Sequence, residues 1–386
     1  MKLSRLHLAG CVLVSLALTA GAQTATPAAQ PVSDAGNFQL SLVTPVQIQN
    51  ADRAIDGLRI NLIYGQNTDV SGMDIGIINH ATGNLNGAEI GVVNIVEGQA
   101  SGFQLGIING IGEAFSGHQA APVGVNYVGG ASAGWQETAA GVNVVMDKMD
   151  GGQVNIFGIN YVGADGDNQL SAAGINWITE VQAGVQAVAA GLNYAGGDAD
   201  VQLSAAGINL SLGTVSAGQL VAAGVNLASE SVDNQINAFG INYAGESASG
   251  VQISAAGINW AGDKSDAQVV AAGLNAADSI SGAQFAAAGV NFANGDANGA
   301  QALVAGINIA GGAVKGAQCV LPLLGINYAS EVDGAQWSAI NVASKVKGFQ
   351  FGAINYCDEL DGLQVGVINI ATQNSLPVMV VVNANW

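Results

Sequence analysis

Residues 252–259 have the sequence QISAAGIN, and close variants of this octapeptide recur along the middle of the chain. Residues 169–176 read QLSAAGIN, and residues 284–291 read QFAAAGVN. Toward both ends the unit is two residues shorter, as in residues 364–369, which read QVGVIN. Each unit therefore begins at a Gln and ends at an Asn, and in the long form Gly lies two residues before the Asn.

The Asn residue marks the period of the repeat. It recurs from Asn61 to Asn383 at spacings of 14 to 19 residues. Self-similarity of this kind is typical of stacked repeat units, not of separate globular domains. We expect one repeat domain over residues 37–386, with short units in 61–109, long Ala-rich units in 110–327, and short units plus a C-terminal strand in 328–386.

Each unit is expected to form a short strand followed by a turn. β-Branched and aromatic residues surround the Asn, as in residues 257–260 (GINW), and turn-forming residues lie between units, as in residues 163–168 (GADGDN). A helix is a poor interpretation because glycine recurs in every unit and no capped 3.6-residue apolar stripe is present. The sequence therefore predicts an all-β fold.

The composition excludes several classes of protein. Of 386 residues, 55 are Gly, 49% are hydrophobic and only 10% are charged, with a formal net charge of −19. Disordered chains are poor in apolar residues, and collagen needs a triplet repeat that this chain lacks. The acidic balance would repel phosphate, so we expect no nucleic-acid partner.

The N-terminus has the order of a secretory signal peptide. Lys2 and Arg5 precede an apolar run, and the small residues 20–22 (AGA) follow it. We expect a signal peptide over 1–22, cleavage after Ala22, a linker over 23–36 and export from the cytoplasm. A lipid attached to Cys11 is the alternative, although that cysteine precedes most of the apolar run.

Stacked units would place equivalent Asn residues above one another. Each amide could then donate to one neighbouring rung and accept from the other, which satisfies a buried polar column. Alternatively, each Asn occupies a turn that needs the left-handed backbone region; both interpretations can hold, and neither makes these residues catalytic. The central members of the expected ladder are Asn176, Asn193, Asn209, Asn226, Asn242, Asn259, Asn275 and Asn291, with Gln169, Gln202, Gln252 and Gln284.

Two folds could accommodate these strands: a β-solenoid of about 21 short strand-turn units and an outer-membrane β-barrel. Three features favour the barrel: the signal peptide, strand segments of about 9–11 residues, which is the length that crosses a membrane, and the terminal Trp386. A barrel of so many strands would enclose a wide hydrated lumen, for which the strands have too few polar residues. We therefore expect the solenoid and keep the barrel as the alternative.

The sequence offers little that could carry chemistry. After the signal peptide only His80 and His118 remain, and no His, Cys and carboxylate residues have metal-ligand spacing. Acidic pairs such as Asp165 and Asp167 could hold calcium, but solvated turn residues are the simpler interpretation. Cys319 and Cys357 occupy different places in the repeat, so two separate thiols are expected, although export would permit a disulfide. We expect no catalytic residue, metal or cofactor.

The repeat region resembles a family of bacterial surface repeat proteins described from leptospires. The resemblance runs from residues 38–45 (FQLSLVTP) and 57–65 (GLRINLIYG) through repeats such as 362–369 (GLQVGVIN) to the ending at 376–386 (LPVMVVVNANW). It implies a location in the cell envelope or at the cell surface of a Gram-negative bacterium, and it implies neither an enzymatic activity nor a ligand. We expect a non-enzymatic scaffold or adhesin; a membrane pore or anchor is the alternative.

Overall fold

The computed structural model describes residues 35–321 and 324–386. The predicted signal peptide, its cleavage site, Cys11 and nearly all of the linker lie outside the described residues. Residues Gly36–Trp386 form one compact unit. Strands make up 77% of the described residues, which contain no helix. Within those residues there is accordingly no helix with the length and apolarity to cross a membrane.

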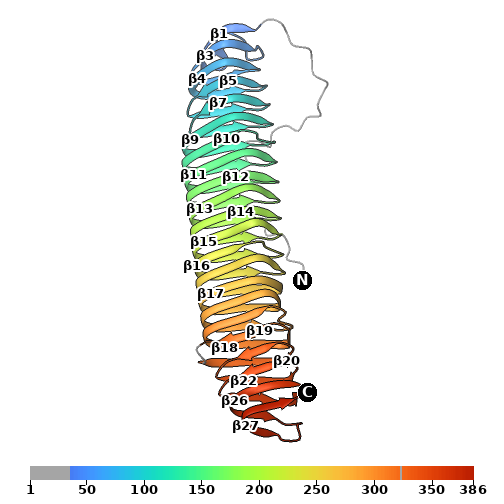
Figure 1. The fold of residues 1–386 in the computed structure, drawn as a ribbon. Coiled ribbons are helices and arrows are strands. Elements are labelled where there is room, and N and C mark those ends of the chain that lie inside the picture. The colour runs from blue at the N-terminus through green and yellow to red at the C-terminus, as the bar shows by residue number, and fades with distance from the viewer. Residues whose placement is uncertain (1–34, 322–323) are drawn as a thin grey trace, which may run out of the picture. The chain divides into compact units, whose positions relative to one another are not determined.

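The strands of this unit form a β-solenoid of about 21 turns. Each turn, here called a coil, pairs in parallel with the next, and the coils follow one another from β1 to β27 in the order of the sequence (Figure 1). The expectation of a solenoid is confirmed. The barrel alternative is wrong, because each coil bonds to its neighbours along the stack and no pairing joins the first coil to the last.

In the N-terminal coils the short strands β5 to β8 lie between the longer strands β3, β4 and β9. Their bounds are β1 Gly36–Val43, β2 Val46–Gln47, β3 Ile55–Asn67, β4 Val70–Ala81, β5 Leu85–Ile90, β6 Val93–Val96, β7 Ala100–Leu105, β8 Ile108–Ile111 and β9 Phe115–Val128.

The central coils are longer and more continuous, and β17 runs through three of them. Their bounds are β10 Trp135–Val145, β11 Met149–Val162, β12 Gly166–Ile178, β13 Gln182–Ala195, β14 Ala199–Ser211, β15 Val215–Ala228, β16 Gln235–Ala244, β17 Ala248–Ala293 and β18 Ala300–Val314.

The C-terminal coils are short again. Their bounds are β19 Ala317–Val320, β20 Gly325–Val332, β21 Ala335–Trp337, β22 Ile340–Val346, β23 Phe349–Phe351, β24 Ile354–Cys357, β25 Glu359–Leu360, β26 Gly362–Ala371 and β27 Val378–Asn385.

The pairing register places like residues above like residues. Between β12 and β13, Gln169 pairs with Gln186, and Asn176 pairs with Asn193. The register shifts between Gly166 and Gln169, outside the motif. Between these two central coils the additional residue therefore lies in the turn. Where short units meet long ones, Gln104 pairs with Gln119 and Asn109 with Asn126, so the two additional residues lie between the Gln and the Asn and both columns stay aligned.

Glycine two residues before the Asn is required by the close approach of neighbouring coils. Gly257 has φ of 153°, and a Cβ built on it would lie 1.8 Å from the carbonyl oxygen of Gly240 in the preceding coil. No side chain fits at that distance, and L-residues rarely adopt this φ. The recurring Gly thus allows the corner of each coil to stack directly on the corner below it.

The two ends of the stack depart from the parallel pattern. At the N-terminal end β1 pairs with β2 in antiparallel orientation and with β3 in parallel. At the other end β27 lies antiparallel on β26. This reversal corrects one expectation: Asn383 faces Gln364 and does not extend the Asn series, because the chain turns back between β26 and β27.

Candidate functional site

The repeating Asn residues form a continuous hydrogen-bonded column inside the stack. Asn259 shows the pattern: its Nδ2 donates to Asn275 Oδ1 at 2.9 Å, and its Oδ1 accepts from Asn242 Nδ2 at 2.9 Å. The same Nδ2 also donates to the carbonyl oxygen of Val269 at 2.8 Å. The central members joined in this way are Asn176, Asn193, Asn209, Asn226, Asn242, Asn259, Asn275 and Asn291.

The Gln residues form a second column whose hydrogen bonds run in the opposite direction. Gln252 Nε2 donates to Gln235 Oε1 in the preceding coil at 2.8 Å, whereas each Asn donates to the following coil. Its second hydrogen bond goes to the carbonyl oxygen of Trp260 in its own coil, at 2.9 Å. The four predicted residues Gln169, Gln202, Gln252 and Gln284 all belong to this column.

Both columns are closed to solvent. The Asn and Gln side chains named above are fully buried. Burying amides is favourable only when their donors and acceptors are satisfied, and the ladders supply partners on both sides. The amides of these central residues therefore hold neighbouring coils together and are closed to a ligand from outside.

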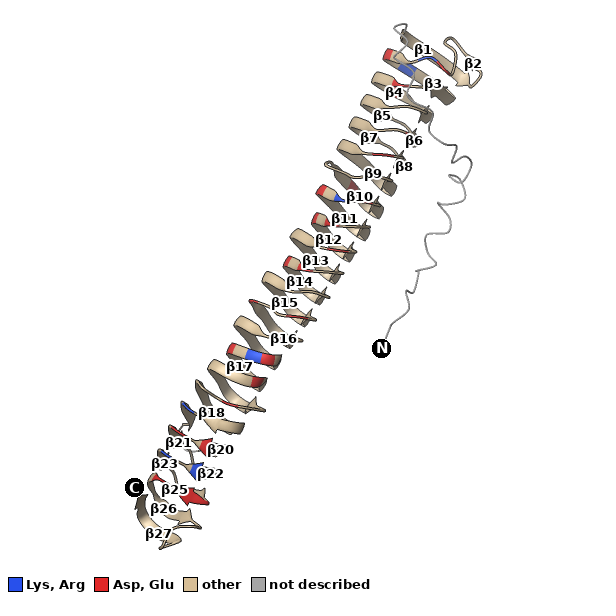
Figure 2. Cartoon of the chain, turned by 90° about the vertical axis from the view of Figure 1, so that its right-hand side faces the viewer, with Lys and Arg blue, Asp and Glu red and all other residues tan. Residues whose placement is uncertain are grey.

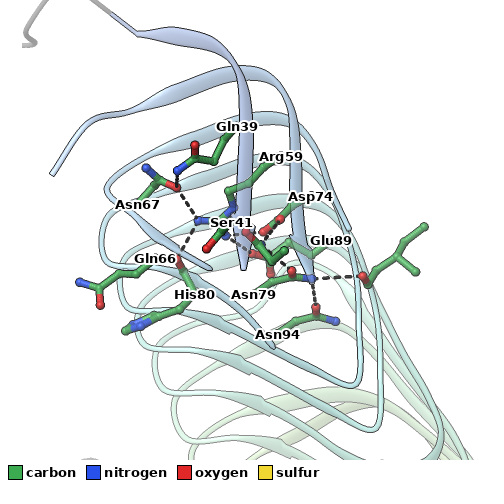
Figure 3. Close-up of polar contacts among 12 residues, drawn as sticks. Gln39, Ser41, Arg59, Gln66, Asn67, Asp74, Asn79, His80, Glu89 and Asn94 are labelled. Atoms are coloured by element: carbon green, nitrogen blue, oxygen red, sulfur yellow. Dashed lines mark hydrogen bonds and ion pairs between the residues drawn. The ribbon is translucent and has the colours of Figure 1, made fainter. Parts of the chain in front are cut away.

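At the N-terminal end the Gln column continues with ionisable residues (Figure 3). In register order the column reads Gln39, Arg59, Asp74, Glu89 and then Gln104. The side chains of Arg59, Asp74 and Glu89 are all fully buried. A buried cation and two carboxyl groups thus lie where the repeat elsewhere places neutral amides; these three residues are here called the ionic cluster.

The contacts of the ionic cluster join both ladders. Arg59 Nη2 forms a short ion pair with Asp74 Oδ2, and Arg59 Nη1 donates to the carbonyl oxygen of His80 at 2.9 Å. Asn61, in the Asn column, donates from Nδ2 to Asp74 Oδ1 at 2.8 Å. Gln104 Nε2 donates to Glu89 Oε2 at 2.7 Å. Glu89 thus accepts the hydrogen bond of Gln104, the first Gln that donates along the ladder.

The electrostatics of the cluster favour a proton on Glu89 and a negative charge on Asp74. Burial, and then the negative charge of Asp74, raise the pKa of Glu89 well above its ordinary value. Burial also raises the pKa of Asp74, but the ion pair and hydrogen bond with Arg59 oppose that rise. With Glu89 protonated and Asp74 ionised, the cluster is neutral overall, which is the state that burial favours.

Among the described residues, the ionic cluster holds the only fully buried Asp, Glu, Lys or Arg side chains. Asp165 and Asp198 accept backbone N–H groups of the next coil, from Val181 at 3.1 Å and Thr214 at 2.9 Å. Among the described residues no three His, Cys, Asp or Glu side chains gather as a metal site. Cys319 and Cys357 are free thiols, and burial raises the pKa of Cys357 to about 12.

The spacing of Asp74 and Glu89 in the sequence indicates the ionic cluster, although the pattern of Gln and Asn residues alone does not include them. Asp74 lies five residues before Asn79, and Glu89 lies five residues before Asn94, which is the offset of Gln in the short units. If every residue five places before an Asn is assigned to the Gln column, whatever its type, both carboxyl groups are predicted to lie inside the stack. No family model, curated protein or solved structure matches the chain.

Proposed function

We propose that the chain is a non-enzymatic, exported repeat protein of the cell envelope that serves as a scaffold or an adhesin. The observation that carries this proposal is the use of the repeated residues. The Asn, Gln and Gly residues that define each unit are engaged in contacts between coils, as Asn259 and Gln252 illustrate. Repetition here maintains a regular framework of contacts between neighbouring coils, which supports a structural role.

Export is supported by the order of charged, apolar and small residues over 1–22. The resemblance to bacterial surface repeat proteins agrees with an envelope location. Within the described part of the chain, the buried ionic cluster has no contact with solvent that a substrate would need. A framework role therefore accounts for the cluster without assigning it a reaction.

Fractionation of cells that express the full chain tests the proposal. We expect the protein in the envelope fraction, with a mature N-terminus at Gln23, and we expect protease added to intact cells to degrade it. A chain that retains Met1 and stays in the cytoplasm would contradict the proposal. Mass spectrometry of the purified N-terminus also distinguishes cleavage after Ala22 from lipid attachment at Cys11.

A further inference from the structure

Charge is distributed very unevenly around each coil. The segments from each Gln to two residues beyond its Asn contain no Asp, Glu, Lys or Arg in the fourteen coils that begin at Gln153 and end at Ala371. The charged residues of these coils lie between these segments, and Figure 2 shows them in turns and also on strands, as in β17. The outward side chains of these uncharged segments are here called the apolar flank.

The apolar flank carries a shallow groove in its central part. The groove runs from the coil of Val154 to that of Ala287 and is lined by the first three residues after successive Gln residues, most often a large apolar residue first and an alanine third. Polar residues also line it, namely Asn155, Ser171, Ser204, Asn237 and Ser254. Leu220 with Ala222 and Phe285 with Ala287 are examples. The large residues are substantially exposed: Leu220 is 46% and Phe285 is 45% accessible.

A ridge of aromatic side chains also belongs to the apolar flank. It consists of residues that directly follow the Asn, and the rings of Trp177 and Tyr194 stack with centroids 4.0 Å apart. Tyr243 and Trp260 occupy the same place in later coils and are exposed. None of these aromatic residues lines the groove: the groove lies on the arm of the coil that follows the Gln, and the ridge lies on the facing arm that follows the Asn.

We propose that the apolar flank binds the same flank of a second copy of this chain. A two-fold interface brings one surface patch against itself, and the groove suits this because its exposed large side chains, such as Leu220 and Phe285, could pack against the alanines of the same groove in the partner. Contiguous apolar surface much larger than a few hundred Å² is rare on monomers and marks an interaction site. The inference rests on the fold and does not depend on the proposed function.

The size of the apolar flank matches a stable dimer. Strands lie about 4.8 Å apart and four residues extend about 13 Å, so one strand segment from each of the fourteen coils gives a strip of about 900 Å². A standard interface takes about 800 Å² from each partner. One strip of the flank is therefore sufficient for specific pairing.

The charge pattern favours a second copy over a lipid surface. Peripheral membrane surfaces place Lys and Arg beside their apolar residues to meet anionic headgroups. The apolar flank has none, and the neighbouring turns are mainly acidic, as at Asp165, Asp198 and Asp263. In a pair joined through the flanks the acidic turns remain in water, where salt screens charges more than about 8 Å apart.

Sedimentation equilibrium of the full chain tests the proposal. We expect the wild-type protein at twice the mass of one chain. Ala205 and Ala255 are exposed on the flank, and replacing both by Glu (A205E with A255E) would bury unpaired charge and weaken the dimer by at least about 100-fold. The matched control is A183E with A217E, because these exposed alanines precede the Gln on the acidic side. We expect the control to remain a dimer.

The possible results distinguish a second copy of the chain from a lipid surface as the partner of the apolar flank. A wild-type monomer, or a flank variant that still dimerises while retaining its circular dichroism spectrum, would overturn the proposal. Flotation of a wild-type monomer with neutral phosphatidylcholine vesicles would identify lipid as the occupant instead. Assemblies that grow without limit would equally contradict a closed pair. If the flank variant loses its β-sheet spectrum, A205S with A255S should fold and remain dimeric, and a monomer in that case also overturns the proposal.

Discussion

At the scale of single residues, the buried amides make the clearest prediction. Asn259 donates two hydrogen bonds, to Asn275 and to the backbone of Val269, and it accepts from Asn242 and Ser254. Replacing it with Leu leaves hydrogen-bonding groups unpaired in both neighbouring coils. Each buried donor or acceptor without a partner lowers the free energy of unfolding by about 1–3 kcal/mol. A leucine could regain about 2 kcal/mol of burial only if it fitted without strain. We expect Asn259→Leu to lower the free energy of unfolding, measured by denaturant titration.

Two further variants control that experiment. Asn259→Asp keeps the size of the side chain but removes both donors, and it should also destabilise the protein. Asn86→Leu makes the same change as the first variant at an exposed position, where surface substitutions usually cost within about 0.5 kcal/mol. Equal stability of all three variants and the wild type would show that the ladder contributes nothing.

The ionic cluster predicts a pH dependence with a definite sign. Because the folded-state pKa of Glu89 is raised, the folded chain holds this proton at pH values where the unfolded chain has lost it. The corresponding stability is fully present below the unfolded pKa of about 4.3 and is lost as pH rises toward the folded value. Glu89→Gln cannot ionise and keeps an acceptor for Gln104. We expect its melting temperature to exceed that of the wild type increasingly as pH rises from 5 to 8.

Two variants give that pH profile its controls. Glu180→Gln makes the same change in an exposed turn, so a similar gain there would exclude Glu89 as the cause. Asp74→Asn removes the nearer carboxylate partner of Arg59 and leaves only Glu89, 3.8 Å from the guanidinium, to balance the buried cation, so this variant should be less stable than the wild type. A neutral effect of Asp74→Asn would contradict the assignment of the ionised carboxylate to Asp74.

At the scale of elements, the antiparallel strand β27 caps the last coil. It pairs with β26 from Gly362 to Ile370, and Asn383 Nδ2 donates to Gln364 Oε1 at 3.3 Å. Removing residues 372–386 should speed amide exchange in β24 and β26, while coils between Asn176 and Asn259 keep their protection, because each coil contacts mainly its neighbours. Hydrogen exchange read by mass spectrometry measures both regions.

Asn383→Leu is the matched variant, since it keeps the strand and removes only the donor to Gln364. We expect a smaller increase of exchange, confined to β26. Loss of protection throughout the central coils after truncation would instead mean that the stack opens as one cooperative unit.

The elements also show how far sequence reasoning extends. The spacing of Asn, Gln and Gly predicted the stacked β-units, because a fixed period of chemically identical residues has few other physical explanations. The direction of β27 could not be predicted, since Asn383 follows the same local pattern in either orientation. The ionic cluster was missed because Asp74 and Glu89 differ chemically from the Gln whose place they take, and burial of charge is set by the register of distant strands.

At the scale of the whole stack, position along the column should determine local stability. Opening a terminal coil breaks one interface with a neighbour, whereas opening a central coil breaks two. We expect faster amide exchange near residues 61–79 than in residues 176–291 of the full chain. Uniform protection, or a less protected centre, would count against stability that is carried by contacts between neighbouring coils.

The opposed donor directions of the Asn and Gln columns have a consequence for length. A single file of aligned amides would accumulate a dipole with every rung, as an α-helix does, and would concentrate partial charge at its ends. Here each additional coil contributes one Asn amide that donates to the following coil and one Gln amide that donates to the preceding coil. The two side-chain dipoles therefore largely cancel, whatever the number of coils. Repeat units can therefore be gained or lost by duplication or deletion without building an electric field along the molecule.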